Sequence, residues 1–262
     1  MIGECRGWDV ETELLSHWQQ HRDLFPHIPS QSCFNRRRRN LWQAFNLLRR
    51  IIVHQMDLAQ DGQCVIDSLP IPVVQFYWVP GSTGDWSVHG AGFGEVPSKK
   101  QTMFGYKLSL LIALGGLIID LELAPASVSE LEVGFELLSH HTDLDVLGDK
   151  AFVSVDRAAV LWHRNRLRLR TVLRRNQKVQ LPAEEKRLIN AKRQIIETVN
   201  ARLSGQFHIE CNHAHTFAGL CMRLYARLTA HTLSICLSRL LGNPDFLQIK
   251  SLTFAIIRQY VS

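Results

Sequence analysis

The longest apolar stretch of the chain, Leu108 to Ile119, is interrupted by the pair Gly115–Gly116. Crossing a bilayer as a helix takes about 20 apolar residues, so a stretch this short and broken predicts no membrane span. Two apolar runs that flank a glycine turn favour a β-hairpin instead, with strands over 104–113 and 117–123.

The remaining segments alternate between strand-like and helix-like patterns. Cys64–Ser68 is an apolar run that Pro70 and Pro72 are expected to end, and Ser127-x-x-Glu130 has the form of a helix-start signal. Predicted strands cover 64–68, 104–113, 117–123, 145–149 and 167–173, and predicted helices cover 9–25, 35–58, 127–138, 155–164, 182–203 and 218–241. This order of elements predicts a mixed α/β layer arrangement.

Changes in composition divide the chain into three regions. Residues 1–60 predict a helical N-terminal region, 61–242 predict one α/β domain, and 243–262 follow as a C-terminal tail. Within the domain, residues 77–100 are rich in Gly, Ser and Pro, which is typical of an irregular insertion.

The composition favours an ordinary globular protein with an anionic partner. Hydrophobic residues make up 46% of the 262 residues and charged residues 21%, and the formal net charge is +6. A basic balance of this kind favours nucleic acid as the partner. The six cysteines include no Cys-x-x-Cys pair, which favours reduced thiols and a cytoplasmic location.

Three acidic residues stand out by their context. Asp67 and Asp149 each follow an apolar strand, and Glu197 lies on the polar side of the predicted helix 182–203. Carboxylates held close together repel one another and need cations to remain ionised. Oxygen ligands suit Mg²⁺ or Mn²⁺, and a pair of such ions supports in-line phosphoryl displacement. The alternative is that these acids are ordinary turn or surface carboxylates, since Asp is common before turns.

Several strings around these acids resemble the core of bacterial insertion-sequence transposases of the DDE class, and the insertion sequence 982 family in particular. The strings are Val65-Ile66-Asp67-Ser68, Lys99-Lys100 with Phe104-Gly105-Tyr106-Lys107-Leu108, Leu147-Gly148-Asp149-Lys150, and Ile195-Ile196-Glu197-Thr198-Val199. The run Phe34 to Arg39 resembles the N-terminal region of the same family. The resemblance therefore extends over nearly the whole chain.

This resemblance implies an RNase H-like fold of the ribonuclease H superfamily, with a mixed sheet, helices on both faces and a helical region before it. It implies that Asp67, Asp149 and Glu197 are the catalytic residues and hold two Mg²⁺ or Mn²⁺ ions. The implied reaction is hydrolysis at the element ends, followed by attack of the freed 3′-hydroxyl on target DNA. It also implies double-stranded DNA as partner, a dimer or higher assembly on that DNA, and a cytoplasmic protein that associates with the bacterial nucleoid.

The chain departs from related transposases around its third acid. Those proteins often carry Tyr-x-x-Arg-x-x-x-Glu-x-x-x-x-x-x-Lys; here Arg193 and Glu197 fit, while Asn190 and Ser204 replace the Tyr and the Lys. Two alternatives therefore stay open beside an active transposase. One is an impaired or truncated remnant that only binds DNA, and the other is a nuclease on the same core.

Clustered basic residues predict the DNA-contacting surface, since cations that neutralise phosphates dominate DNA affinity. The alternative is a solvated helix face. The predicted contacts are Arg36, Arg37, Arg38, Arg39, Lys99, Lys100, Lys107, Lys150 and Arg193.

Two lesser patterns have weaker interpretations. Cys211-x-His213-x-His215 has the spacing of a partial zinc site, but no second ligand pair accompanies it. Trp78 and Trp86 lie in the glycine-rich segment, where they are candidates for stacking on an unpaired base or for core and lid packing.

Overall fold

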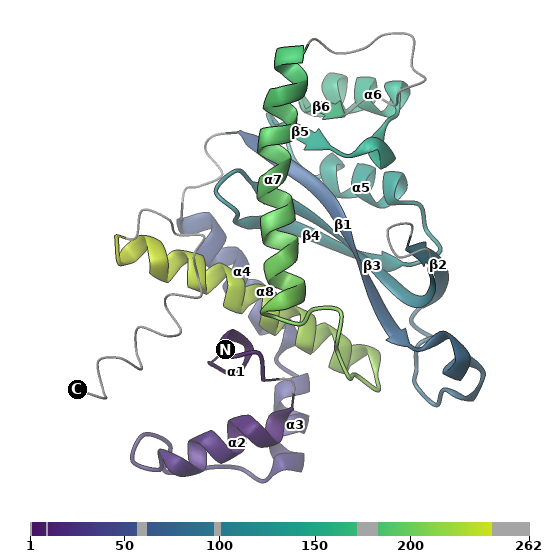
Figure 1. Ribbon diagram of the computed structural model, residues 1–262. Helices are drawn as coiled ribbons and strands as arrows, with labels where there is room; N and C mark the ends of the chain where they lie inside the picture. The colour runs from purple at the N-terminus through teal and green to yellow at the C-terminus, as the bar shows by residue number, and fades with distance from the viewer. Residues whose placement is uncertain (1, 9, 57–61, 97–100, 172–182, 243–262) are drawn as a thin grey trace. The chain divides into compact units, whose positions relative to one another are not determined.

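Alternating apolar residues build a mixed six-stranded sheet from the middle of the chain (Figure 1). The computed structural model describes residues 2–8, 10–56, 62–96, 101–171 and 183–242. Its contacts separate unit 1 (residues 1–55, 83–85 and 201–262) from unit 2 (residues 56–82 and 86–200). The division places residues 201–242 with the N-terminal helices, and the domain boundaries drawn from composition remain a prediction.

Unit 2 contains the sheet and the helices that cover it. Its elements are β1 (Gln63–Val74), η1 (Phe76–Gly81), β2 (Gly92–Val96), β3 (Gln101–Ala113), β4 (Ile118–Pro125), α5 (Glu130–Ser139), β5 (Asp145–Gly148), η2 (Lys150–Phe152), α6 (Val155–Asn165), β6 (Arg168–Thr171) and α7 (Ala183–Gly205), of which α7 belongs to this unit as far as Asn200.

The strands lie in the order β2-β3-β1-β5-β6, and β4 pairs with β3. β3 is antiparallel to β1 and to β4, whereas β5 is parallel to β1 and β6 is parallel to β5. The predicted hairpin is confirmed as β3 and β4, with Gly116 in its turn at a φ of 80° that favours glycine. The predicted mixed α/β arrangement is also confirmed.

β1 is longer than the sequence predicted, because neither Pro70 nor Pro72 ends it. Both prolines pair with β3, opposite Lys107 and Gly105. Proline is tolerated in a strand where its missing N–H would face an unpaired edge. Among the described residues, β5 pairs with β1 only as far as Ile66, so the other edge of β1 has no neighbour beyond that point.

The two faces of the sheet carry different side chains. Every second residue of β1, such as Cys64 and Ile66, points into the core that also contains side chains of α5 and α6. Because side chains alternate along a strand, Asp67 points to the opposite face. Figure 1 shows α7 crossing one face of the sheet, and α7 supplies the partner of Asp67 described below.

The start of α5 differs from the prediction. The Oγ of Ser129, two residues after Ser127, accepts a hydrogen bond from the N–H of Glu132 at 3.2 Å. The sequence offers Ser-x-x-Glu twice in succession, and the turn from Pro125 to Val128 leaves Ser129 to act as the N-cap. Glu130 therefore opens the helix instead of closing a capping box.

Unit 1 is helical and consists of α1 (Ile2–Cys5), α2 (Glu11–Gln20), α3 (Gln31–Arg39), α4 (Trp42–Gln55) and α8 (Phe217–Leu240). The single helix predicted over 35–58 is wrong, since the chain turns at Asn40 and Leu41 between α3 and α4. Ser30 caps α3, so the four arginines occupy its last turn, where cations favour the helix dipole.

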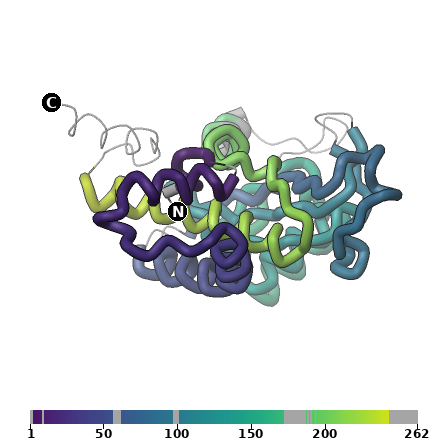
Figure 2. The backbone as a smooth tube through the Cα atoms, turned by 90° about the horizontal axis from the view of Figure 1, so that it is seen from below, coloured from purple at the N-terminus to yellow at the C-terminus, as the bar shows by residue number. Residues whose placement is uncertain are grey.

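Ion pairs join α1, α2, α3 and α8 of unit 1, whose backbones Figure 2 shows from below. Glu4 of α1 binds Arg38 of α3 and lies 3.5 Å from the Nε of Arg227 of α8. Glu11 of α2 accepts from Arg38 at 3.1 Å and from Arg223 of α8 at 3.0 Å. Since Arg227 is almost fully buried, these carboxylates supply charge compensation that the core requires.

The other predicted helices and strands form with small shifts at their ends. The predicted tail 243–262 lies outside the described residues, as do the last two residues of the strand predicted over 167–173. No helix within the described ranges is both long and apolar enough to span a membrane.

Replacing Gly134 of α5 by alanine should destabilise unit 2. A Cβ there would lie 2.3 Å from Cε1 of Phe152 and 3.2 Å from Cδ1 of Ile66. Overpacking costs about 1–3 kcal/mol, which outweighs the roughly 1 kcal/mol that helix propensity gains. Urea unfolding measures the change. Gly205→Ala on α7 is the control, since an added Cβ meets nothing within 4 Å; equal stability of both variants would contradict the packing.

Replacing His231 of α8 by leucine should flatten the dependence of stability on pH. His231 is fully buried, and neither ring nitrogen has a hydrogen-bond partner among the described residues; burial, reinforced by the charge of Arg202, lowers its pKa from 6.5 to about 3. As pH falls, the His231 imidazole takes up a proton near pH 6.5 in the unfolded chain but only near pH 3 in the folded protein. The free energy of unfolding is therefore fully retained above pH 6.5 and falls between pH 6.5 and pH 3, by up to about 1.4 kcal/mol per pH unit. Thermal unfolding of both proteins from pH 7 to 5 tests this, and parallel profiles would refute it.

Candidate active site

Strand register brings two of the predicted acids side by side. The last parallel pair between β1 and β5 is Ile66 with Gly148, and Asp67 and Asp149 are the next residues on the two strands. Neighbouring strands in a sheet lie about 4.8 Å apart, so the two backbones leave this pair close together. The sequence predicted that Asp67 lies at or near the end of its strand. In the structure Asp67 lies within β1, where it pairs with Leu110 of β3.

A short turn and a buried ring fix Asp149. Its carboxylate caps η2 by accepting the N–H of Lys150 at 2.6 Å. Three residues after Asp149, Phe152 is 1% exposed and packs so tightly that an added Cβ at Gly148 would lie 3.1 Å from the Phe152 Cβ. The Phe152 ring also fills the space beside Gly134 of α5. Packing on the face of the sheet that α5 covers therefore fixes the position of the Asp149 carboxylate.

Asp67 lies in an environment that disfavours its charge. Burial raises its pKa above the ordinary value of 3.8, and the negative charges of Asp149 and Glu130 raise it further. A backbone hydrogen bond from Ser68 and a side-chain hydrogen bond from Asn200 act in the opposite direction. Asp67 and Asp149 therefore interact electrostatically, as carboxylates that share a cation would.

Sequence reasoning missed two residues of this site. Glu130, the first residue of α5, lies close enough for its charge to act on Asp67, and it was interpreted only as part of a capping box. Asn200 of α7 donates from Nδ2 to Oδ2 of Asp67 at 2.8 Å. Its spacing of three residues after Glu197 was the one signal that could have placed it on the same side of the helix.

Glu197, the third predicted acid, is exposed on α7. Within the ranges that the structure describes, no three His, Cys, Asp or Glu side chains come close enough together to hold a metal ion. The structure thus brings Asp67 and Asp149 together and leaves Glu197 outside their group.

The oxygen atoms at this site still fit a divalent cation. Two adjacent carboxylates repel each other, and Oδ1 of Asn200 is buried with no hydrogen-bond partner in the described part of the chain. Hard cations such as Mg²⁺ and Mn²⁺ prefer carboxylate and amide oxygens. An ion between them would relieve the repulsion and satisfy the amide oxygen.

The predicted DNA contacts occupy several environments. Arg36, Arg37, Arg39 and Lys150 are exposed, whereas Arg38 is committed to Glu4 and Glu11. Nζ of Lys107 donates to the carbonyl of Val128 at 3.3 Å. Lys99 and Lys100 lie outside the described residues, as does the side chain of Arg193.

A basic pocket of about 420 Å³ lies among α2, α3 and α8 in unit 1. We call it the arginine pocket. Three arginines and two histidines line it beside Glu11, namely Arg38, Arg39, Arg223, His213 and His215. Arg39 has no acidic partner among the described residues, so its charge is available to an anion.

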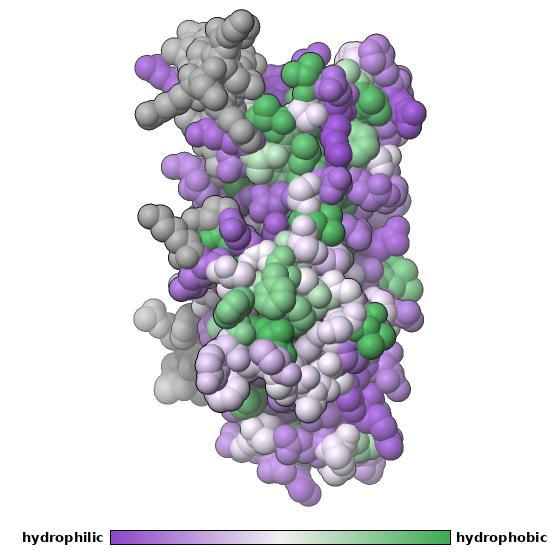
Figure 3. All heavy atoms as spheres, turned by 90° about the vertical axis from the view of Figure 1, so that its right-hand side faces the viewer, coloured by the Kyte–Doolittle hydropathy of each residue, from purple (hydrophilic) through white to green (hydrophobic). Residues whose placement is uncertain are grey.

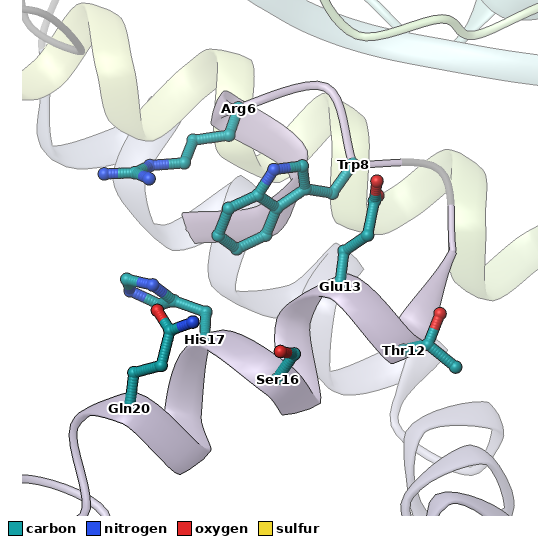
Figure 4. Close-up of a pocket in the computed structure, with 7 residues that line it drawn as sticks. All are labelled: Arg6, Trp8, Thr12, Glu13, Ser16, His17 and Gln20. Atoms are coloured by element: carbon teal, nitrogen blue, oxygen red, sulfur yellow. The ribbon is translucent and has the colours of Figure 1, made fainter.

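Unit 1 has a second hollow, of about 440 Å³, along α2 (Figure 4). The guanidinium of Arg6 lies 5.2 Å from the ring centre of Trp8, which is itself 5.2 Å from the ring of His17. Desolvation, together with the charges of His21 and Arg6, lowers the pKa of His17. The hollow contains neither of the paired acids.

Unit 2 exposes an aromatic patch formed by η1 and β2, on the side viewed in Figure 3, where hydrophobic and weakly polar residues gather among hydrophilic ones. Phe76, Tyr77 and Trp78 are 60%, 81% and 61% exposed, and Phe76 contacts Phe93 at a centroid distance of 5.7 Å. Trp86 is only 3% exposed, so of the two tryptophans considered for base stacking it is a core residue.

Residues 89–216 match the sequence model of a family described as "Transposase DDE domain". No curated protein and no solved structure matches the chain. The match supports a DDE-type transposase, a class that acts on DNA and generally uses divalent metal ions, and whose domain implies an RNase H-like fold consistent with the mixed sheet. The matched stretch includes Asp149 and Glu197 and begins after Asp67. The evidence that Asp67 lies at the site is therefore the pairing of β1 with β5, and not the family match.

Asp67→Asn should raise the melting temperature of the metal-free protein. The raised pKa means that ionised Asp67 costs stability at neutral pH, a cost that is absent below pH 3.8 and grows as pH rises through the folded-state pKa. Asparagine keeps an oxygen for the Nδ2 of Asn200 and carries no charge. Thermal unfolding in EDTA at pH 7.5 measures the effect. Asp23→Asn, at an exposed turn, is the control, and a lower melting temperature for Asp67→Asn would refute the environment described.

Proposed function

We propose that this protein is a DNA transposase of the insertion sequence 982 family, with an RNase H-like catalytic core over residues 61–242. It would cleave the ends of its element and transfer them into target DNA. The observation that carries the proposal is the placement of Asp67 beside Asp149 by the β1–β5 register, in a chain whose residues 89–216 match a DDE domain.

The chemistry depends on how these residues hold charge. Asp67 and Asp149 would hold the Mg²⁺ or Mn²⁺ ions, with Glu197 as the predicted third carboxylate. When bound, two such ions activate the attacking oxygen and stabilise the leaving oxygen of an in-line phosphoryl displacement. The N–H of Lys150 orients the carboxylate of Asp149, and the amide of Asn200 orients that of Asp67. Partial burial of Asp67 strengthens its attraction for a cation, because the effective dielectric is lower there.

Exposed basic side chains of each unit would hold the DNA. The exposed side chains Arg36, Arg37, Arg39 and Lys150 are suited to phosphates, and each neutralised phosphate steepens the salt dependence of binding by about 0.9 in log–log slope. Lys99, Lys100, Lys107 and Arg193 complete the proposed set. Because two element ends must be joined together, we propose a dimer or higher assembly on DNA, in the bacterial cytoplasm and on nucleoid DNA.

A nicking assay tests the proposal, using duplexes from the DNA that flanks the gene, where terminal inverted repeats are expected. The parent should nick these ends with Mg²⁺ or Mn²⁺ and produce joined products with a target duplex. Asp67→Ala and Asp149→Ala should each lower the rate by at least about 100-fold, since each removes charge from the reacting centre. Glu197→Ala tests the third carboxylate separately. Glu136→Ala on the exposed side of α5 is the control, and variants that nick as fast as the parent would refute the assignment.

The same assay separates two alternatives. A nuclease on this core would cut the ends without forming joined products. A DNA-binding remnant would bind the ends in EDTA and would not cut them, whichever divalent ion is added. The departures at Asn190 and Ser204 from related transposases motivate this second candidate.

A further inference from the structure

The helix α7 is aligned along β1 by two polar contacts. Nζ of Lys192 donates to Oε1 of Gln63 at 2.5 Å, and Nδ2 of Asn200 donates to Oδ2 of Asp67 at 2.8 Å. Eight residues of helix rise about 12 Å, and four residues of strand about 13 Å. The two spacings match, so helix and strand run in the same direction and Asn200 stays opposite Asp67.

The phase of α7 turns Asn200, and not Glu197, towards the sheet. Ile189, Ile196, Val199 and Leu203 are buried and define the inner side of the helix. At about 100° per residue, Asn200 lies roughly 40° from the direction of Ile196, whereas Glu197 lies about 100° away and is exposed. The side chain of this helix that contacts Asp67 is therefore an amide.

The amide of Asn200 is only half satisfied. Its Nδ2 is committed to Asp67, while its Oδ1 is buried and has no hydrogen-bond partner among the residues that the structure describes. Buried polar atoms in native proteins nearly always have partners. The opposite orientation of the amide would place Oδ1 against the Asp67 carboxylate, so the hydrogen bond determines which atom is left over.

We infer that Asn200 has two roles at this site: it positions Asp67 through Nδ2, and it supplies Oδ1 as a neutral oxygen ligand to a divalent cation held by Asp67 and Asp149. The inference rests on the proposed metal site and names a ligand that the acid motif lacks. An uncharged oxygen completes coordination without adding a negative charge beside Asp67, whose charge burial already disfavours.

Mn²⁺ binding to the full chain, without DNA, tests this inference by isothermal titration and by electron paramagnetic resonance. Asn200→Leu removes both amide atoms and should weaken Mn²⁺ affinity by about 10-fold or more, as losses of ligand-orienting groups do. Asn200→Asp keeps an oxygen and adds charge, so it should bind Mn²⁺ at least as tightly as the parent. Thr198→Ala, an exposed neighbour on α7, is the matched control and should bind like the parent.

Rescue by aspartate separates a ligand from a structural residue. If Asn200→Leu and Asn200→Asp both bind Mn²⁺ like the parent, or both lose binding although circular dichroism in EDTA is unchanged, the inference is overturned. If the expected affinity pattern appears while no protein nicks DNA, the cation site stands and the transposase proposal fails. If the parent nicks DNA but substitutions at residue 200 leave Mn²⁺ affinity unchanged, the transposase proposal stands and the inference about Asn200 fails.

Discussion

The parallel pairing of β1 with β5 is the constraint on which the candidate site depends. It ends at Ile66 and Gly148, and this shared end point places Asp67 and Asp149 next to each other. Packing on the opposite face holds the register, because Phe152 fits only where Gly134 and Gly148 have no side chains. The consequence is a partly buried carboxylate, Asp67, whose pKa is raised by its surroundings.

Unit 1 is organised by charge to an unusual degree. Arg49 and Arg227 are both about 1% exposed, and Glu4 and Glu11 compensate the arginines of α3 and α8. Arginine is suited to this role because its planar group makes several directed hydrogen bonds. The same feature divides the predicted DNA-binding run: Arg38 turns inward to the acids while its neighbours remain exposed.

Local errors in the sequence predictions have physical causes in tertiary contacts. Pro70 and Pro72 do not end β1 because, within the described ranges, no strand pairs with one edge of β1 at these residues. The run 35–58 is apolar enough for one helix, yet it breaks near Asn40 so that α4 can pack along α8. In α5, two overlapping Ser-x-x-Glu signals were equivalent locally, and the turn before the helix selected Ser129.

The sequence by itself determined the hairpin, the short strand that ends before Asp149, and the long helix that carries Glu197, because apolar periodicity and glycine turns act locally. It also marked Asp67 and Asp149, although their proximity came from the resemblance and not from spacing. Only the tertiary structure decided which side of α7 meets the acids. Helical phase turned Asn200 towards Asp67, and the position of α5 brought its first residue, Glu130, within electrostatic range of Asp67. Both effects depend on contacts between segments far apart in the chain, which no local pattern encodes.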